Sequence, residues 1–390
     1  MKEVKLRVCY FGTYLRDYPR NKIIIDGLRS NDVEVIECHV DLWKGIEPRW
    51  REIKSFFGKI KLAYRMIAAY ISLCLMHQEI AGDYDAMVVG YTGHFDIFLA
   101  RLLASSKRRP LIFDAFVSLY NTLVEDRRLF KPNSLVANIL QRLDRFTSNI
   151  SDAVLLDTHA HIAYFRNMLN VDKTNLHNLW AGADDTVFFP RVSTQKDRKF
   201  TVLFIGGFIP LQGVKHIVQA ALLLEKKRDI RFRLIGSGQQ YEEAVELADD
   251  AGSENIEFVG WMPYEILPQE IVSAQVCLGI FGTTEKAKRV IPNKVYMAAA
   301  MAKPIITGDS PAMREIFTNK KNILFCEVGN PQAIADSIML LKNNERLRST
   351  IARGGYMLFR HNFAPAVIGK MAKEIISESM KSDIHHAKEG

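Results

Sequence analysis

Short apolar segments alternate with segments of helical periodicity along almost the whole chain, and this alternation constrains the fold more than any other feature. Apolar residues at helical spacing, as in Ile23–Leu28, separate runs of strand length. In the first part of the chain these runs are Val4–Phe11, Val33–Cys38, Ala86–Val89, Pro110–Phe113 and Ala153–Leu156. Strand–helix alternation of this kind predicts an α/β protein with a parallel, doubly wound sheet.

The same alternation starts again near residue 200. Gly206 and Gly207 follow the first run of this second series, and a helical pattern covers about Gly213–Leu224. The runs of the second series are Phe200–Ile205, Phe232–Ile235, Ile256–Val259, Val276–Ile280, Pro304–Thr307 and Asn322–Cys326. The polar, proline-bearing stretch 187–198 is typical of a linker. We therefore predict two Rossmann-like domains that face a central cleft, with ligands at the carboxyl ends of the strands.

Length and composition agree with a soluble two-domain protein. A chain of 390 residues is too long for one ordinary core. The longest apolar stretch, Met66–Met76, falls short of the ~18 residues of a membrane span, and the N-terminus lacks the apolar region of a signal peptide. The five cysteines never form a C-x-x-C pair, so we expect reduced thiols in a cytoplasmic protein, without disulfides or a zinc site.

The net charge of +8 favours anionic partners without choosing among nucleic acid, acidic lipid and phosphorylated small molecules. We expect no nucleic-acid binding. A nucleic-acid binder usually has a clustered basic face with interleaved aromatic residues, and only one stretch of this chain comes close to that pattern. That stretch, 44–65, carries seven basic and two acidic residues. Its apolar side chains recur at helical spacing, at Trp50, Ile53, Phe57, Ile60, Tyr64 and Ile67. Residues 44–67 thus indicate a helix on an anionic membrane surface, or a helix docked on the first sheet with its cations in water.

Four stretches resemble motifs of the family-four retaining glycosyltransferases, which have the GT-B fold. They are residues 181–190 (AGADDTVFFP), 206–213 (GGFIPLQG), 234–238 (LIGSG) with 258–261 (FVGW), and 292–304 (PNKVYMAAAMAKP) with 309–315. The resemblance implies metal-independent transfer of a hexosyl-type unit from a nucleotide-diphosphate sugar to a glycan or lipid-linked acceptor, with retention and without a cofactor. It implies an acceptor domain at 1–190, a nucleotide-sugar domain at 191–364, and a C-terminal helix, 365–390, that returns to the first domain.

Two of these stretches, 206–213 and 292–304, also have the properties of an anion-binding site. Gly206 and Gly207 lie between a strand and a helix, where backbone N–H groups can approach a phosphate closely. Pro292 precedes a helix that starts near Asn293, and the first N–H groups of that helix favour an anion. Arg289 and Lys294 add full charges there. The alternative is that both are solvated surface charges.

The chain departs from the family at several positions. The family's two glutamates, seven residues apart, map to Arg289 and Met297, neither of which accepts a hydrogen bond as a carboxylate does. Gln212 replaces a lysine and Gly207 an arginine, whereas Glu315 fits the pattern. Two hypotheses follow: a divergent transferase in which Arg289 and Lys294 bind the phosphates, or a non-catalytic GT-B-like subunit that binds a nucleotide sugar or another protein.

These motifs, together with strand-end positions, give the expected site. Expected catalytic residues are His94, Arg289 and Lys294; donor-binding residues are Gly12, Gly206, Gly207, Gln212, Gly236, Asn293, Val295 and Glu315; the acceptor-binding residue is Arg20. A lone histidine such as His94 is equally compatible with a structural role, and Arg20 with an exposed loop. We expect no metal site, since His159 and His161 are two residues apart and do not share a helix face.

Overall fold

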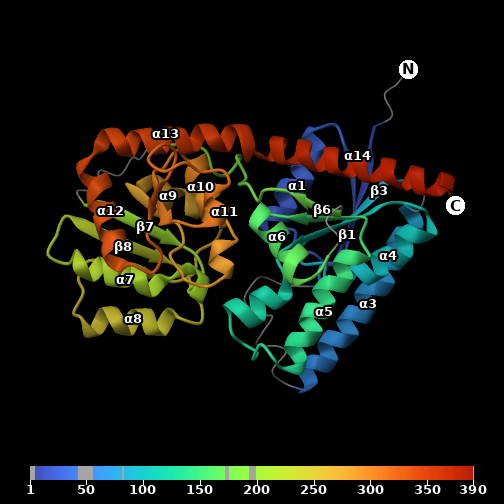
Figure 1. Ribbon diagram of the computed structural model, residues 1–390, viewed down its shortest axis with the longest axis horizontal. Coiled ribbons are helices and arrows are strands. Elements are labelled where there is room, and N and C mark those ends of the chain that lie inside the picture. Colours follow the sequence, from blue (N-terminus) through green and yellow to red (C-terminus); the bar gives the residue numbers. More distant parts are fainter. Residues whose placement is uncertain (1–4, 43–55, 81–82, 172–174, 193–198, 390) are drawn as a thin grey trace.

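The computed structural model describes residues 5–42, 56–80, 83–171, 175–192 and 199–389, and it consists of two α/β lobes (Figure 1). Each lobe contains a six-stranded sheet in which every strand pair is parallel. Long helices near the C-terminus run along one edge of both lobes (Figure 1). The predicted α/β architecture of two doubly wound, Rossmann-like domains is confirmed.

The first sheet has the strand order β2-β1-β3-β4-β5-β6. Its strands are β1 (Arg7–Gly12), β2 (Glu34–His39), β3 (Ala86–Val89), β4 (Leu111–Phe116), β5 (Ala153–Leu156) and β6 (Leu176–Asn178). Its helices are α1 (Pro19–Ser30), α3 (Phe56–Ile80), α4 (Asp96–Ser106), the π-helix η1 (Asn121–Asp126), α5 (Leu135–Asn149) and α6 (His159–Met168). Strands β3 and β4 are buried throughout, which explains their apolar sequences, interrupted in β4 by Asp114 alone.

The second sheet has the order β12-β11-β10-β7-β8-β9. Its strands are β7 (Phe200–Ile205), β8 (Ile230–Ile235), β9 (Ile256–Val259), β10 (Val276–Leu278), β11 (Ile305–Gly308) and β12 (Leu324–Cys326). Its helices are η3 (Pro210–Gln212), α7 (Val214–Leu223), α8 (Tyr241–Asp250), α9 (Leu267–Ser273), η4 (Lys286–Lys288), α10 (Asn293–Ala300), α11 (Pro311–Arg314) and α12 (Pro331–Asn343). The strand order reverses between β7 and β10, where a doubly wound sheet opens a crevice for ligands.

Every strand expected from the sequence overlaps a strand of the structure, with ends displaced by a few residues. Strand β6 was not predicted; its three residues, Leu-His-Asn, include one buried side chain. It joins the sheet by pairing with β5, from Val154–Leu176 to Leu156–Asn178. Such a short edge strand is held by its neighbour more than by its own apolar pattern.

The chain returns to the first lobe through its last two helices. Helix α13 (Glu345–Asn362) packs on α10, and α14 (Pro365–Glu389) packs along α1. Gly27 and Gly369 touch at that crossing, where a Cβ on Gly369 would lie 1.9 Å from the carbonyl carbon of Gly27. Asn31 closes the contact by donating to the Ala366 carbonyl at 2.7 Å. The interface therefore requires glycine on both helices.

Helix α3 corrects one expectation from the sequence. The apolar pattern that starts in 44–67 continues to Ile80, and Ile60–Ile80 is long and apolar enough to cross a membrane by length and composition. The sequence criterion demanded an uninterrupted apolar run, which Arg65 and the polar residues of this helix break. One face of α3 packs on the first sheet, with Ala69, Leu73 and His77 buried. Residues 44–55 of the predicted helix, which include Trp50 and Ile53, lie outside the described residues.

Candidate functional site

The glycines predicted for donor binding lie at the carboxyl ends of β7 and β8. Gly206 and Gly236 have φ values of +155° and +140°, which favour glycine. A Cβ on Gly236 would lie 1.9 Å from the Gly206 carbonyl oxygen, so the two turns lie against each other. Gly207 has no neighbour closer than 3.6 Å to the position of a Cβ. The two glycine turns thus bring backbone groups together at the carboxyl ends of β7 and β8.

Lys294 lies beneath this glycine turn. It belongs to the first turn of α10, and its Nζ lies 3.0 Å from the position that a Cβ on Gly206 would take. The ammonium donates to Gln212 Oε1 at 2.5 Å and lies 3.6 Å from the centroid of the Phe204 ring. The structure therefore brings together three residues that the sequence placed in the donor site: Gly206, Gln212 and Lys294.

The environment of Lys294 is poor in negative charge. The residue is 9% exposed, and burial lowers its pKa well below the ordinary range of lysine. Among the described residues, no carboxylate lies within ion-pair distance of its Nζ; the contacts are an amide oxygen and an aromatic face. Burying a lysine without a counter-ion disfavours its charged form, and an anion beside the Nζ would favour it again.

The start of α10 offers further donors. Pro292 is the N-cap, and the helix begins at Asn293. The N–H of Val295 donates to the Pro292 carbonyl at 2.9 Å, so this predicted donor is already engaged. The N–H groups of Asn293 and Lys294 precede it in the first turn, where the positive end of the helix favours an anion.

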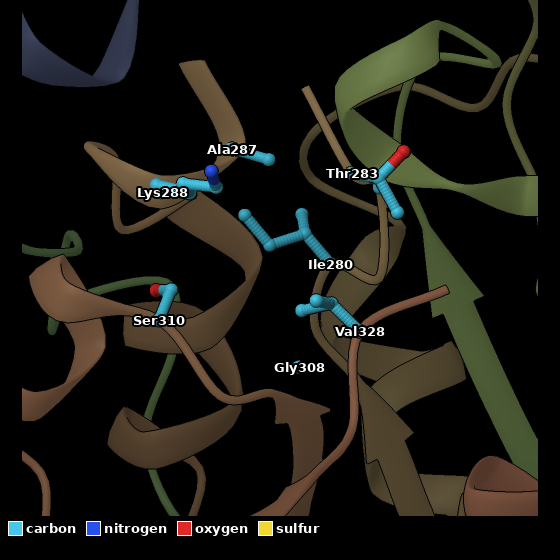
Figure 2. A pocket seen from close by; sticks show the side chains of 8 residues that line it. Ile280, Thr283, Ala287, Lys288, Gly308, Ser310 and Val328 are labelled. Carbon is cyan, nitrogen blue, oxygen red and sulfur yellow. The ribbon is translucent and has the colours of Figure 1, made fainter. Parts of the chain in front are cut away.

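A cavity of about 200 Å³ lies at the carboxyl ends of β10 and β11. Figure 2 shows the side chains of Ile280 and Val328 within it, with Lys288 and Ser310 on one side and Thr283 on the other. The remaining lining residues are Gly282, Ala287 and Gly308. Gly282 and its neighbour Phe281 donate to the carbonyls of η3 at 3.2 and 3.1 Å, which ties the cavity wall to the segment that carries Gln212. Among the described residues, no cluster of side chains suits a metal ion.

Arg289 lies between the two domains, apart from the Lys294 group. Its guanidinium pairs with Glu125 of η1 at 3.1 Å and stacks 4.2 Å from the centroid of the Tyr164 ring. Its carbonyl accepts from Thr158 of the first domain at 2.5 Å. Arg289 is therefore not a solvated surface charge: its charge is matched by Glu125 of the other domain and, at 3.7 Å, by Glu285 of its own domain.

Lys286 was not singled out from the sequence, yet its side chain contacts the first domain. Its Nζ donates to Thr122 at 2.7 Å, and burial lowers its pKa to about 8, with Asp126 opposing the shift. Thr284 adds a contact to Asp126 at 3.3 Å. The sequence signal was the basic run 286–289 (KAKR), but no local pattern shows which of its cations points into the interface.

Glu315 also contacts the first domain. Its carboxylate accepts from the backbone N–H groups of His159 and Ala160 at 2.8 and 2.7 Å. These are the first N–H groups of α6, whose positive end attracts a carboxylate. Glu315 thus caps a helix across the interface in this structure, rather than facing an open nucleotide position.

His94 is 2% exposed and inaccessible to a ligand in this structure. Its ring lies edge-on to Phe113, and its Nε2 is 3.8 Å from Asp144. Burial lowers the pKa of His94 to about 4 and raises the pKa of Asp144 to about 6. The Asp144 carboxylate accepts from Ser118 Oγ at 2.6 Å and from two backbone N–H groups. This geometry fits the structural alternative for His94.

Arg20 has a different place from the one expected. It lies in the first turn of α1, 1% exposed, and its guanidinium pairs with Asp114 of β4 at 2.7 and 2.8 Å. It also donates to the Leu179 carbonyl at 2.9 Å and stacks on Phe116. Acceptor binding by Arg20 is therefore corrected: the helix starts early enough to turn this side chain into the sheet, where it joins three segments of the first domain.

Gly12 likewise serves packing within the first domain. It ends β1 with φ of +129°, and a Cβ there would lie 2.6 Å from Asp96 Oδ2. The same carboxylate oxygen accepts from the N–H of Thr13 at 2.7 Å. A side chain at position 12 would therefore displace the start of α4, which is sufficient reason for glycine.

Sequence comparisons connect the second domain to a known family. Residues 199–344 match the family described as Glycosyl transferases group 1. An uncharacterized glycosyltransferase of Methanocaldococcus jannaschii is 28% identical over 153 residues, which are 39% of this chain and 41% of that protein. The 2-deoxystreptamine N-acetyl-D-glucosaminyltransferase of Niallia circulans is 22% identical over 280 residues, 69% of this chain and 70% of that protein.

A third relative, the lipopolysaccharide core biosynthesis glycosyltransferase LpsD of Rhizobium meliloti, is 21% identical over 170 residues, 43% of this chain and 47% of that protein. The chain thus spans less than half of the length of this relative and of the archaeal one. The similarity is carried by part of each protein.

Solved structures resemble the whole chain in fold. HepE of Anabaena in complex with UDP and glucose has a TM-score of 0.70 at 14% identity, covering 96% of this chain and all of that one. Sucrose-phosphate synthase of Thermosynechococcus elongatus has a TM-score of 0.73 at 13% identity, covering 97% and 100%. The chain therefore has the two-domain GT-B fold, and the second domain contains the segment, 199–344, that matches the family described as Glycosyl transferases group 1.

Proposed function

We propose that the protein transfers a sugar from a nucleotide-diphosphate sugar to an acceptor, with retention at the anomeric carbon and without a bound metal or cofactor. Fold alone does not fix the reaction, so the proposal depends on the site. The observation that carries it is Lys294, a buried ammonium beside Gly206 and Gln212 that has no carboxylate partner among the described residues. A diphosphate in the β7–β10 crevice would supply the missing negative charge.

In this proposal the second domain stabilises the leaving diphosphate. Its negative charge grows as the bond to the sugar breaks, and groups already oriented toward it lower the barrier without reorganising. With the diphosphate bound, Lys294 contributes a full charge, and the N–H groups of Gly207 and of the first turn of α10 contribute further donors. The N–H of Gly206 is already engaged, since it donates to the Ile235 carbonyl at 2.9 Å. Lys294 and the start of α10 would together offset the negative charge of the diphosphate, a role that a divalent metal ion has in other transferases.

The donor and acceptor classes are proposals by likeness. Structures of Anabaena HepE include complexes with UDP and with UDP-glucose, so a uridine-diphosphate hexose is the first donor to test. The cavity beside Thr283 and Ser310 offers hydroxyl groups and the Lys288 ammonium above an apolar floor, which suits a sugar. LpsD is named for lipopolysaccharide core biosynthesis, and we propose a glycan or lipid-linked acceptor of the cell envelope, made on the cytoplasmic side.

A second candidate function is a non-catalytic GT-B-like subunit. It is favoured by the use of an expected catalytic residue and an expected donor residue elsewhere: Arg289 pairs with Glu125, and Glu315 caps α6. Met297 takes the place of a carboxylate and is itself buried. In this alternative the polar contacts between the domains are the purpose of these residues, and nucleotide binding survives without turnover.

The test is a panel of nucleoside diphosphates in thermal unfolding, since a ligand that binds only the native state raises its melting temperature. We expect at least one nucleoside diphosphate to raise the Tm of the wild type. The same compound should leave the Tm of the Lys294→Met variant unchanged. Release of nucleotide from the matching sugar donor with lipid extracts then separates the two candidates. Binding without release favours the subunit, and a panel without any Tm increase removes both.

A further inference from the structure

Helix α3 presents an apolar stripe to solvent on the side opposite its packing face. Its exposed side chains are 53% to 73% accessible and occur at Ile60, Tyr64, Ile67, Ile71 and Leu75. The spacings of four and three residues place them along one line of the helix. The opposite line carries the buried residues that contact the first sheet. A helix of a soluble domain normally places polar residues where α3 places aliphatic ones.

The two neighbouring helices extend this surface. In the strand order β2-β1-β3-β4-β5-β6, the connections from β2 to β3, from β3 to β4 and from β4 to β5 all run in the same direction across the sheet. Right-handed crossovers therefore place α3, α4 and α5 on one face, and α1, whose connection runs the other way, on the opposite face with α14. Tyr70 of α3 hydrogen-bonds Asp96 at the start of α4, and Phe98 of α4 stacks on Phe146 of α5 with 5.8 Å between ring centroids. In Figure 1, α3 and α5 both lie on the side of the lobe that faces away from α14.

The same helices expose cations and almost no carboxylates. Lys61, Arg142 and Arg145 are exposed on α3 and α5. Among the described residues of the three helices, Glu79 is the one exposed carboxylate, because Asp96 and Asp144 are buried. A surface that exposes aromatic and aliphatic side chains together with basic ones is complementary to the anionic surface of a lipid bilayer.

We propose that this surface, which we call the α3–α5 face, docks the first domain onto an anionic lipid membrane. The domain lies on the bilayer rather than crossing it, since α3 keeps Leu73 and His77 buried in the fold and bonds His77 to Tyr84 at 2.9 Å. Apolar side chains enter the headgroup boundary and the basic residues meet lipid phosphates. The proposal concerns the first domain alone and does not depend on sugar transfer.

The location of the face makes docking compatible with an open cleft. Helix α5 follows η1, and η1 carries Glu125, which meets the second domain at Arg289. The α3–α5 face covers the outer side of the first sheet, whereas Glu125 and Thr122 lie at the boundary between the domains. A membrane bound to these helices therefore lies beside the cleft and leaves the second domain in water.

The experiment is co-sedimentation of the full chain with vesicles of phosphatidylcholine, alone or mixed with phosphatidylglycerol. We expect the wild type to sediment with the mixed vesicles, and less of it at high salt because screening weakens the cationic contacts. Ile67→Glu combined with Ile71→Glu should reduce the partition coefficient at least tenfold. Arg142→Glu combined with Arg145→Glu should reduce it several-fold on mixed vesicles and leave neutral vesicles unaffected.

Matched controls lie on the second domain. Leu223→Glu removes an equally exposed aliphatic side chain, and Lys226→Glu with Arg228→Glu inverts two exposed cations. All variants are compared by melting temperature, and Ile67→Ser with Ile71→Ser replaces the glutamate pair if that pair unfolds the domain. The controls should bind vesicles as the wild type does.

Several results would overturn membrane docking. Absence of wild-type binding to mixed vesicles, or equal binding by the Ile67/Ile71 variant, would do so directly. Retention of bound protein after alkaline carbonate washing would mean that α3 inserts as a span. Concentration-dependent self-association that the Ile67/Ile71 variant abolishes, without vesicle binding, would assign the face to a second copy of the chain.

Discussion

The two domains each bury a cation near the carboxyl ends of their strands, and they treat it in opposite ways. In the first domain Arg20 meets Asp114 at 2.7 Å, together with a carbonyl and an aromatic face. In the second domain Lys294 meets an amide oxygen and an aromatic face. Burial disfavours both charges, but Asp114 more than offsets it and raises the pKa of Arg20, whereas the pKa of Lys294 is lowered.

The difference separates a structural cation from one that awaits a ligand. A charge satisfied within the fold contributes to the fold, and removing it leaves its partner uncompensated. A charge that the fold leaves without a counter-ion lowers stability until an anion arrives. Two residues that look alike in a sequence as basic side chains near strand ends thus have opposite expected consequences on mutation.

The largest effect is expected at the structural cation. Arg20→Met should lower the free energy of unfolding by about 3–5 kcal/mol, because Asp114 would remain buried without its partner. Urea unfolding measures the loss, and Arg16→Met, on an exposed side chain, is the control. Combining Arg20→Met with Asp114→Leu should recover part of the stability. A decrease of less than about 1 kcal/mol in the free energy of unfolding of Arg20→Met would contradict the structural role of Arg20.

The next effect has the opposite sign on stability. Lys294→Met should leave the melting temperature unchanged or raise it, since a desolvated charge is replaced by an apolar chain of similar length. The same variant should weaken binding of the nucleoside diphosphate by about 2–3 kcal/mol, roughly 30- to 150-fold, through loss of a charge-assisted contact. Calorimetry measures the affinity, with Lys226→Met as the control. Strong destabilisation without loss of affinity would give Lys294 a structural role.

The lowered pKa of Lys294 predicts a linkage between pH and both folding and binding. The unfolded lysine titrates near 10.4, so between the folded pKa and that value the unfolded chain holds more protons. In that window the burial penalty of Lys294 decreases and stability rises with pH. A bound diphosphate restores the charge, so binding takes up a proton and weakens as pH rises.

Proton uptake is measured from binding enthalpies at pH 8 in buffers with different ionisation enthalpies. The uptake should vanish in Lys294→Arg, whose guanidinium stays charged throughout. Lys286 also titrates in this range, at about 8, so uptake that persists in Lys294→Arg would point to Lys286 at the domain boundary instead.

The smallest effect is expected at the boundary between the domains. Glu315→Ala removes the carboxylate that caps α6 and should lower stability by about 0.5–1 kcal/mol, with less than a threefold change in nucleotide affinity. Thermal unfolding and calorimetry measure the two quantities, and Glu327→Ala on the exposed surface is the control. A tenfold loss of affinity would instead place Glu315 on the nucleotide, as the sequence suggested.

The sequence predicted the fold more completely than the site. Most of the parallel strands contain an apolar run such as Ala86–Val89, and that pattern needs no knowledge of distant residues. Gly206, Gln212 and Lys294 were also predicted together, because the strand-end glycines and the start of α10 are local signals. His94 and Arg20 were placed less well, since their burial depends on Asp144 and Asp114, which are 50 and 94 positions further along the chain.

What the sequence by itself determined is the layout: two series of apolar strands, the glycines at their ends and a helix entrance with a lysine in its first turn. These depend on periodicity and on backbone geometry, which neighbouring residues set. The tertiary structure alone decided which charges are matched. Arg20 and Arg289 find carboxylates and Lys294 does not, because electrostatic energy depends on burial and on distances between segments far apart in the chain.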